Sequence, residues 1–295
     1  MQMNRLDDIG ENEIRIIGSQ PEQPTSKRRN KKWWIAIIVV ALLLLCAALW
    51  IFVGYKDRQE LGNQTEIEMK VDTPALERPS YVDIADTIIN NVSLHRFIPI
   101  NAKPKLVMGV IKEIPQQYIL GAMAADFGLY KGKYQVVGGF IYHGDMISYS
   151  KSKYGFCALL KDTVVIGNAL STSYFEQAIE EKGDFFRQHA LVTDGKVVNS
   201  VIARTNALRR SLCRLTDGRI CIIDTDMSVS LDSFSEALCQ YGVRDAIALM
   251  GSGAAVRWAV DEAGRRYIAG ADEYDFPEVV NYIIWESPAI EKQRE

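Results

Sequence analysis

An apolar run meets a tight glycine turn in the stretch IALMGSGAAVRW, residues 247–258. The segment Ala246–Leu249 is typical of a buried strand, and Gly251-Ser252-Gly253 predicts a sharp turn at its end. Glycines let backbone N–H groups approach an anion such as phosphate closely. Met250 stands between strand and turn, where catalysis would need a polar group. The stretch therefore predicts a strand–turn unit that is an active site, the remains of one, or only a turn.

The sequence before this unit is rich in short β-hairpins. Asp194-Gly195 and Asp217-Gly218 are the strongest turn signals, because such dipeptides favour the positive φ that tight hairpins need. His143 is expected to be a turn residue. The four segments with apolar or β-branched residues on both sides of a two-residue turn are FIYHGDMI, ALLKDTVVIG, LVTDGKVV and LCRLTDGRICII.

Helical patterns interrupt the hairpins. In SLDSFSEALCQYG, Ser230 is placed to cap a helix that Gly242 ends. STSYFEQAIEEKGDFF also has apolar residues at helical spacing, and DIADTIINNV near residue 83 is a third, weaker candidate. Hairpins with a few packed helices predict an α+β fold with a mixed β-sheet.

Composition sets broad limits on the class of protein. The 295 residues are 48% hydrophobic and 24% charged, as in ordinary folded proteins. The net charge of -3 argues against a nucleic-acid partner, which usually needs a clustered basic face. The segment WWIAIIVVALLLLCAALWIFV, residues 33–53, has no charged residue and is long enough to cross a bilayer as a helix. We therefore expect one transmembrane helix over residues 33–54, so that the membrane is a partner.

The flanking charges predict the orientation of this span. Five basic residues precede it, in SKRRNKK, and two follow it, Lys56 and Arg58. The positive-inside rule then places the N-terminus in the cytoplasm and the C-terminal domain outside it. We expect a disordered cytoplasmic tail over 1–32, a stalk over 55–80 and one folded domain over 81–295.

The cysteines and histidines give no sign of a metal centre. No Cys or His spacing is typical of zinc, and neither a metal nor another cofactor is expected. If Asp217-Gly218 form a two-residue turn, Cys213 pairs with Ile222, and Cys221 points to the opposite face. A Cys213–Cys221 disulfide is therefore not expected, and the cysteines of the domain are interpreted as small core side chains.

The order of segments from about 120 to 260 resembles the phosphodiester glycosidase domain family. This family includes the enzyme that uncovers mannose-6-phosphate by removing N-acetylglucosamine, and bacterial proteins of the exopolysaccharide-biosynthesis type. The resemblance places Arg210 at the family's arginine position and Ser211 at its threonine. The matching segments, in order, are VVGGFIYHGDMI, LVTDGKVV, RRSLCRLTDGRICIID, SVSLDSFSEAL and GVRDAIALMGSGAA.

The chain departs from the family pattern at three site segments. Met250 replaces the acid of the family's Leu-Asp-Gly-Gly-Gly-Ser, and Ala254 replaces its serine. Asp126 lies near the expected asparagine, and His189-Ala190 replace a Gly-Pro pair. A methionine transfers no proton, and general acid–base help is worth roughly 10²–10⁴-fold in rate.

The resemblance implies the candidate site residues. Asp126 and Arg210 would be catalytic, while Gly251, Ser252, Gly253 and Arg257 would bind the phosphate. The acidic residues Asp224, Asp226 and Asp245, or His189, are alternatives for the missing acid.

Three interpretations of function remain. One is a membrane-anchored glycosidase-like protein that acts on or binds sugar-phosphate groups of an envelope glycan, with catalysis reduced or lost. Another is a non-catalytic envelope module that binds glycan or protein. A third possibility is an unrelated membrane-anchored domain.

The predicted topology can be tested by proteolysis. A protease added to intact cells or spheroplasts is expected to digest the C-terminal domain, because the basic residues hold the N-terminus inside. Immunoblotting with antibodies against the domain would follow the digestion. A domain fully protected until the membrane is permeabilised would reverse the predicted orientation.

Overall fold

The computed structural model describes residues 38–41, 43–45, 67–70, 78–161, 163–198, 205–270 and 275–288. The chain divides into two units, Met1–Phe52 and Val53–Glu295. In the first unit, residues 38–41 and 43–45 are helical and lie within the expected span. No helix of the described residues is long and apolar enough to cross a membrane. The rest of the expected span, and the expected tail 1–32, lie outside the described residues, so both stay predictions.

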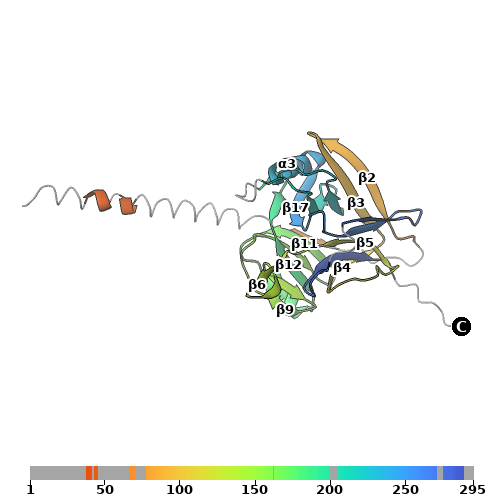
Figure 1. Ribbon diagram of the computed structural model, residues 1–295, viewed down its shortest axis with the longest axis horizontal. Coiled ribbons are helices and arrows are strands. Elements are labelled where there is room, and N and C mark those ends of the chain that lie inside the picture. Colours follow the sequence, from red (N-terminus) through yellow and green to blue (C-terminus); the bar gives the residue numbers. More distant parts are fainter. Residues whose placement is uncertain are drawn as a thin grey trace, which may run out of the picture. The chain divides into compact units, whose positions relative to one another are not determined.

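The second unit is built from antiparallel sheets, and every pairing between described strands is antiparallel. The strand that ends at the glycine turn, β17 (Val243–Leu249), lies inside a seven-stranded sheet (Figure 1). The order of that sheet is β14 (Lys196–Val197), β13 (Ala190–Thr193), β17, β15 (Arg210–Leu215), β16 (Ile220–Asp224), β3 (Val92–Ile100) and β2 (Tyr81–Ile89).

Three further sheets complete the described part of the unit. The six-stranded sheet has the order β1 (Ile67–Lys70), β11 (Thr163–Asn168), β10 (Gly155–Leu159), β12 (Asp184–Gln188), β8 (Phe140–Tyr142) and β9 (Asp145–Ser148). The five-stranded sheet has the order β19 (Arg266–Ala269), β18 (Arg257–Val260), β5 (Tyr118–Met123), β20 (Asn281–Glu286) and β4 (Lys103–Met108). The two-stranded sheet is formed by β6 (Phe127–Tyr130) and β7 (Lys133–Val136).

Two of the three expected helices are present. Helix α3 (Leu231–Tyr241) begins where Ser230 Oγ accepts a 3.0 Å hydrogen bond from Ser233 N–H, and it ends at Gly242 with φ +95°. Helix α2 (Tyr174–Glu180) is shorter than its pattern suggested. The third expectation was wrong, because the segment near residue 83 forms β2, which pairs with β3 along its whole length. The described fold is therefore α+β in the coarse sense, with antiparallel sheets dominating.

The two strongest hairpin signals gave different outcomes. Asp194 and Gly195 both have positive φ and form the expected two-residue turn. At Asp217-Gly218 the expected register was wrong by one residue. Leu215 N–H donates to Arg219 C=O at 2.9 Å, so the loop has three residues, with Gly218 at φ +89°. Cys213 is therefore opposite Cys221, not Ile222.

Strand β1 lies within the range expected to be a stalk. It pairs antiparallel with β11, with Ile67 opposite Ile166 and Lys70 opposite Thr163. Folded structure thus begins before residue 81, and β1 covers what would otherwise be the open edge of β11.

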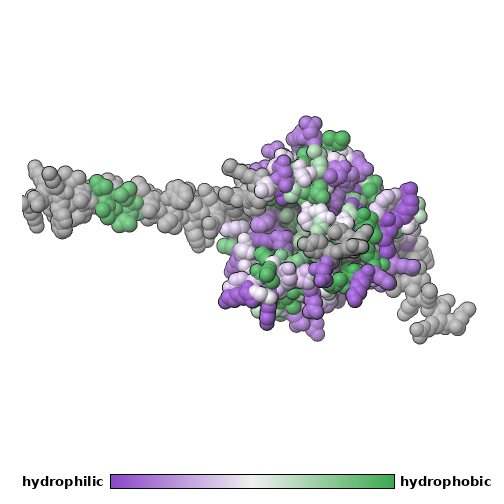
Figure 2. Space-filling model, in the orientation of Figure 1, coloured by the Kyte–Doolittle hydropathy of each residue, from purple (hydrophilic) through white to green (hydrophobic). Residues whose placement is uncertain are grey.

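Apolar side chains from the three large sheets form a shared core. It includes Leu106 of β4, Cys157 of β10 and Ile247 of β17, all almost fully buried. Helix α3 covers a second apolar cluster beside β17, built around Phe234 (Figure 1). The face of the second unit shown in Figure 2 carries hydrophilic residues with apolar patches among them. This packing fixes β15, β16 and β17, the strands that carry the candidate site.

Candidate functional site

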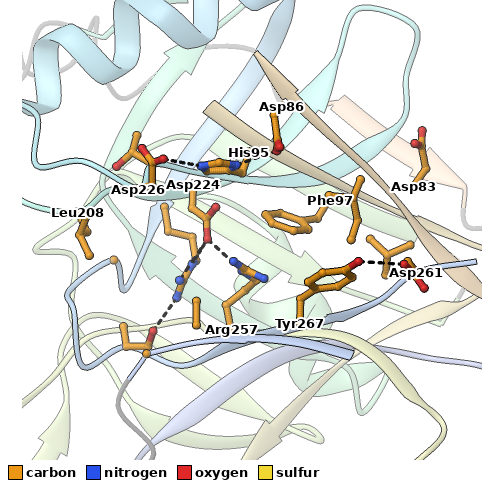
Figure 3. A pocket seen from close by; sticks show the side chains of 18 of the residues that line it. Asp83, Asp86, His95, Phe97, Leu208, Asp224, Asp226, Arg257, Asp261 and Tyr267 are labelled. Carbon is orange, nitrogen blue, oxygen red and sulfur yellow. Dashed lines mark hydrogen bonds and ion pairs between the residues drawn. The ribbon is translucent and has the colours of Figure 1, made fainter. Parts of the chain in front are cut away.

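A buried cluster of three charges lies at the ends of β15, β16 and β18 (Figure 3). Arg210 and Asp224 are opposite each other in register, which brings their side chains together. Asp224 Oδ2 accepts from Arg210 Nη2 at 3.2 Å and from Arg257 Nε at 3.0 Å. Arg257 also lies over the Phe97 ring, 4.1 Å from its centroid. Two guanidinium groups sharing one carboxylate leave one positive charge, which favours a nearby anion.

Arg210 also holds the glycine turn. Its Nη1 donates to the carbonyl oxygens of Met250, Ala255 and Val256 at 3.2–3.3 Å. Burial lowers the pKa of Arg210, while Asp224 opposes that effect. Because these donors are committed to the protein, Arg210 positions the turn and is not free to act on a ligand through them.

A glycine is required at position 251, because the turn packs against the backbone of Arg209 and Arg210. A Cβ at this position would lie 2.7 Å from Arg210 N and 2.9 Å from Arg209 C, closer than side chains tolerate. A Cβ at Gly253 would meet no atom within 4 Å. Within the described residues, the N–H groups of Gly251, Ser252 and Gly253 donate to no protein acceptor. The turn therefore presents three available backbone donors.

Met250 lies between the strand and the turn, as the sequence placed it. Its N–H donates to Ala124 C=O at 3.3 Å, and its side chain packs against a cluster that includes Met123 and Trp258. The side chain thus fills apolar space beside the site, as expected for a flexible thioether.

Asp126 follows β5 and is held by two side chains from other elements. Its Oδ2 accepts from the buried Lys153 ammonium at 2.6 Å, and its Oδ1 accepts from Gln188 Nε2 at 2.9 Å. Buried Asn281 fixes the backbone before it by accepting from Ala125 N–H at 2.7 Å. The Asp126 carboxylate is therefore ion-paired and oriented.

His189 follows Gln188 and lies beside the same group of residues. Burial lowers the pKa of His189, and the positive charge of Lys153 lowers it further. A neutral imidazole at neutral pH is able to accept a proton.

Two cavities meet at the glycine turn. The smaller, of about 260 Å³, is lined by Asp126, Gln188, His189 and Met250, among others. The larger, of about 1050 Å³, is lined by charged and aromatic residues. The wall common to both is formed by Leu208, Arg209, Arg210, Gly251 and Ser252.

His95 lies on the wall of the larger cavity between two carboxylates (Figure 3). Its Nδ1 is 2.7 Å from Asp86 Oδ1, and its Nε2 is 3.2 Å from Asp226 Oδ2. Burial disfavours the charged ring, but the hydrogen bonds to Asp86 and Asp226 outweigh it and raise the pKa of His95. His95 is therefore held on the cavity wall between the carboxylates of Asp86 and Asp226.

The predicted site residues come together only in part. Asp126, Arg210, Gly251 and Ser252 line the smaller cavity, while Gly253 and Arg257 line the larger one only. Asp245 is excluded from the site, since it is buried in a pair with Arg214.

Sequence reasoning missed several residues that build the site. Asp224 was weighed only as a replacement acid, although its place at a strand end opposite Arg210 was the available signal. Lys153, Gln188 and Phe97 carry no motif, and only the tertiary fold brings them to the site. No group of three or more metal-ligating side chains is found in the described part of the chain.

The fold is similar to that of a known glycosidase. The catalytic domain of zebrafish N-acetylglucosamine-1-phosphodiester alpha-N-acetylglucosaminidase, auto-inhibited by its pro-peptide, matches with a TM-score of 0.52 and 13% identity. The match covers 77% of this chain and 90% of that domain. At this identity the similarity shows a phosphodiester-glycosidase-like fold and nothing finer.

A hypothetical protein from Synechocystis matches with a TM-score of 0.47 and 9% identity, over 70% of this chain and 62% of that one. No protein-family model and no curated protein matches the sequence.

The turn geometry predicts unequal costs for two glycine substitutions. Gly251→Ala is expected to lower the free energy of unfolding by about 1–3 kcal/mol, because its Cβ forces the Arg209–Arg210 backbone to move. Gly253→Ala, the matched control, is expected to change it by no more than about 0.5 kcal/mol. Urea unfolding of both variants measures the difference. Equal costs would mean that the turn is not packed against Arg210 as described.

Proposed function

We propose that the domain binds sugar-1-phosphodiester groups of an envelope glycan, with glycosidase catalysis reduced or lost. The observation that carries the proposal is the convergence of Asp126, Arg210 and the Gly251-Ser252 backbone on one cavity that also holds Met250. The phosphodiester-glycosidase-like fold supports the class of ligand. Anchoring by residues 33–54, with the domain outside the cytoplasm, belongs to the same proposal.

The charges at the turn suit a diester better than a neutral ligand. The N–H groups of residues 251–253 and the surplus positive charge of the Arg210–Asp224–Arg257 cluster favour one anionic group there. A phosphodiester carries substituents on both sides of its phosphate, and both cavities reach the turn. The smaller cavity is below the roughly 300–1,000 Å³ typical of drug-sized ligands, so a single sugar suits it.

The chemistry of cleavage is incomplete at this site. Breaking the bond between the sugar and its phosphate oxygen needs a group that donates a proton to the leaving oxygen and one that assists attack at the sugar carbon. Asp126, paired with Lys153, is placed as a base or nucleophile. Met250 leaves no acid where the family has one, and neutral His189 is the nearest group able to exchange a proton.

The alternative proposal is a non-catalytic module that binds glycan or protein in the envelope. The larger cavity favours it, because the aromatic rings of Tyr81, Phe97 and Tyr267 line it together with several carboxylates. Aromatic faces combined with hydrogen-bonding groups are able to hold a polar chain without any phosphate.

Hydrolysis of a methyl or aryl sugar-1-phosphodiester by the purified domain tests the main proposal. The wild type is expected to bind the diester. Its turnover is expected to be absent, or roughly 10²–10⁴-fold below that of an enzyme with the acid, because acid–base catalysis is missing. Met250→Asp is expected to restore a polar site and to destabilise the fold by about 1–3 kcal/mol through partial burial of a carboxylate. Calorimetry measures binding, and thermal unfolding measures the cost.

Asp145→Asn, on the exposed strand β9, is the matched control for Asp126→Asn. Robust turnover by the wild type that Asp126→Asn abolishes and Asp145→Asn retains would replace the proposal with an active enzyme. Absence of diester binding, together with binding of a phosphate-free glycan, would favour the alternative module.

A further inference from the structure

We propose that Cys213 and Cys221 form a cross-strand disulfide on the hairpin that carries Arg210 and Asp224. The two residues are directly opposite each other in the antiparallel register of β15 and β16. Opposed residues of an antiparallel pair have Cα atoms about 4.5–5.5 Å apart, within the 4.4–6.8 Å usual for disulfides. Both side chains point to the same face of the sheet, so the bond requires no change of register.

Burial in one apolar cluster and hydrogen bonds keep the two thiols next to each other. Both side chains are 0% exposed and lie in the apolar cluster beneath α3. The Cys221 thiol is hydrogen-bonded to that of Cys213, whose Sγ is also 3.0 Å from Ser211 Oγ. Cys157 is fully buried in a different cluster and Cys239 lies on α3, so neither is opposite another cysteine in the strand register.

Burial decides when the bond is able to form. Burial raises the pKa of the Cys221 thiol, and thiolate is the form that attacks a disulfide. In the folded chain both side chains are fully buried, so the sulfurs are closed to reagents. The bond is made during folding, when one thiolate attacks a glutathione disulfide or the disulfide of an oxidoreductase. The second thiolate then attacks the protein sulfur of the mixed disulfide and expels the reagent's remaining thiolate. Two protein thiols are thereby oxidised, and the reagent disulfide is reduced to two thiols.

The position of the pair links it to the site. Arg210 and Asp224 are opposite each other three residues farther along the same ladder. A covalent bond at Cys213–Cys221 fixes the register of β15 against β16. This inference does not use diester binding, but it rests on the proposed location of the domain outside the cytoplasm, where disulfides persist.

Peptide mapping of the full-length chain tests the disulfide directly. The chain is refolded with oxidised and reduced glutathione, denatured, and treated with N-ethylmaleimide to block free thiols. Trypsin cleaves after Arg214 and Arg219 and so separates the two cysteines, and a second cut at Glu236 separates Cys221 from Cys239. The expected product is peptide 211–214 linked to the peptide that begins at residue 220, lost on reduction.

Variants provide the controls. Cys239→Ser and Cys157→Ser are expected to keep the linked peptide, while Cys213→Ala abolishes it. Reduction under denaturing conditions, followed by refolding, is expected to lower the melting temperature of the wild type but not that of Cys213→Ala/Cys221→Ala. Alkylation of both Cys213 and Cys221 in wild-type chain refolded under oxidising conditions to a native melting curve would overturn the proposal. So would Cys221 linked to another cysteine.

Discussion

The site depends on the ion pairs that the Asp224 carboxylate forms with Arg210 and Arg257, between which it is buried. Its Oδ2 atom receives hydrogen bonds from both guanidinium groups. Without it, two positive charges would be buried side by side, and breaking such a cluster by removing one partner typically costs about 3–5 kcal/mol. Arg210 extends this cluster to the carbonyl groups of the glycine turn, so strand pairing, charge pairing and turn shape are coupled.

This coupling explains the shape of the turn, irrespective of what Met250 contributes. Gly251 is constrained by contact with the Arg209–Arg210 backbone, and that contact belongs to the fold irrespective of catalysis. Met250 supplies packing toward Trp258 and nothing to proton transfer. The geometry that would hold a phosphate and the chemistry that would cleave its ester are thus carried by different residues.

Local sequence signals predicted those parts of the fold that depend on neighbouring residues. The Ser230 cap, the Gly242 stop and the Asp194-Gly195 turn are each specified within a few positions, and the structure contains all three. The strand β2 was predicted as a helix, since its half-buried pattern resembles both periods and only pairing with β3 decides between them.

At the Asp217-Gly218 loop, a difference of one residue in loop length changes the strand register. A glycine with positive φ fits either a two-residue turn or the last position of a three-residue turn, and the choice reverses which side chains share a face. For the site, the sequence named Asp126, Arg210 and the turn as candidates, and Asp126, Arg210, Gly251 and Ser252 line one cavity. Asp224 was named only as an alternative acid. The contacts of Lys153 and Gln188 with Asp126 were not predictable, because they join segments far apart in the chain.

The central claim is that an anion binds to the backbone of the turn between the two cavities. Amide chemical shifts of the domain, titrated with a non-hydrolysable methyl sugar-1-phosphonate monoester, test it most directly. We expect saturable shifts at the N–H groups of Gly251, Ser252 and Gly253, with smaller changes at residues lining both cavities, such as Arg209. Saturable shifts confined to other surfaces, or none at the turn at any concentration, would contradict the claim.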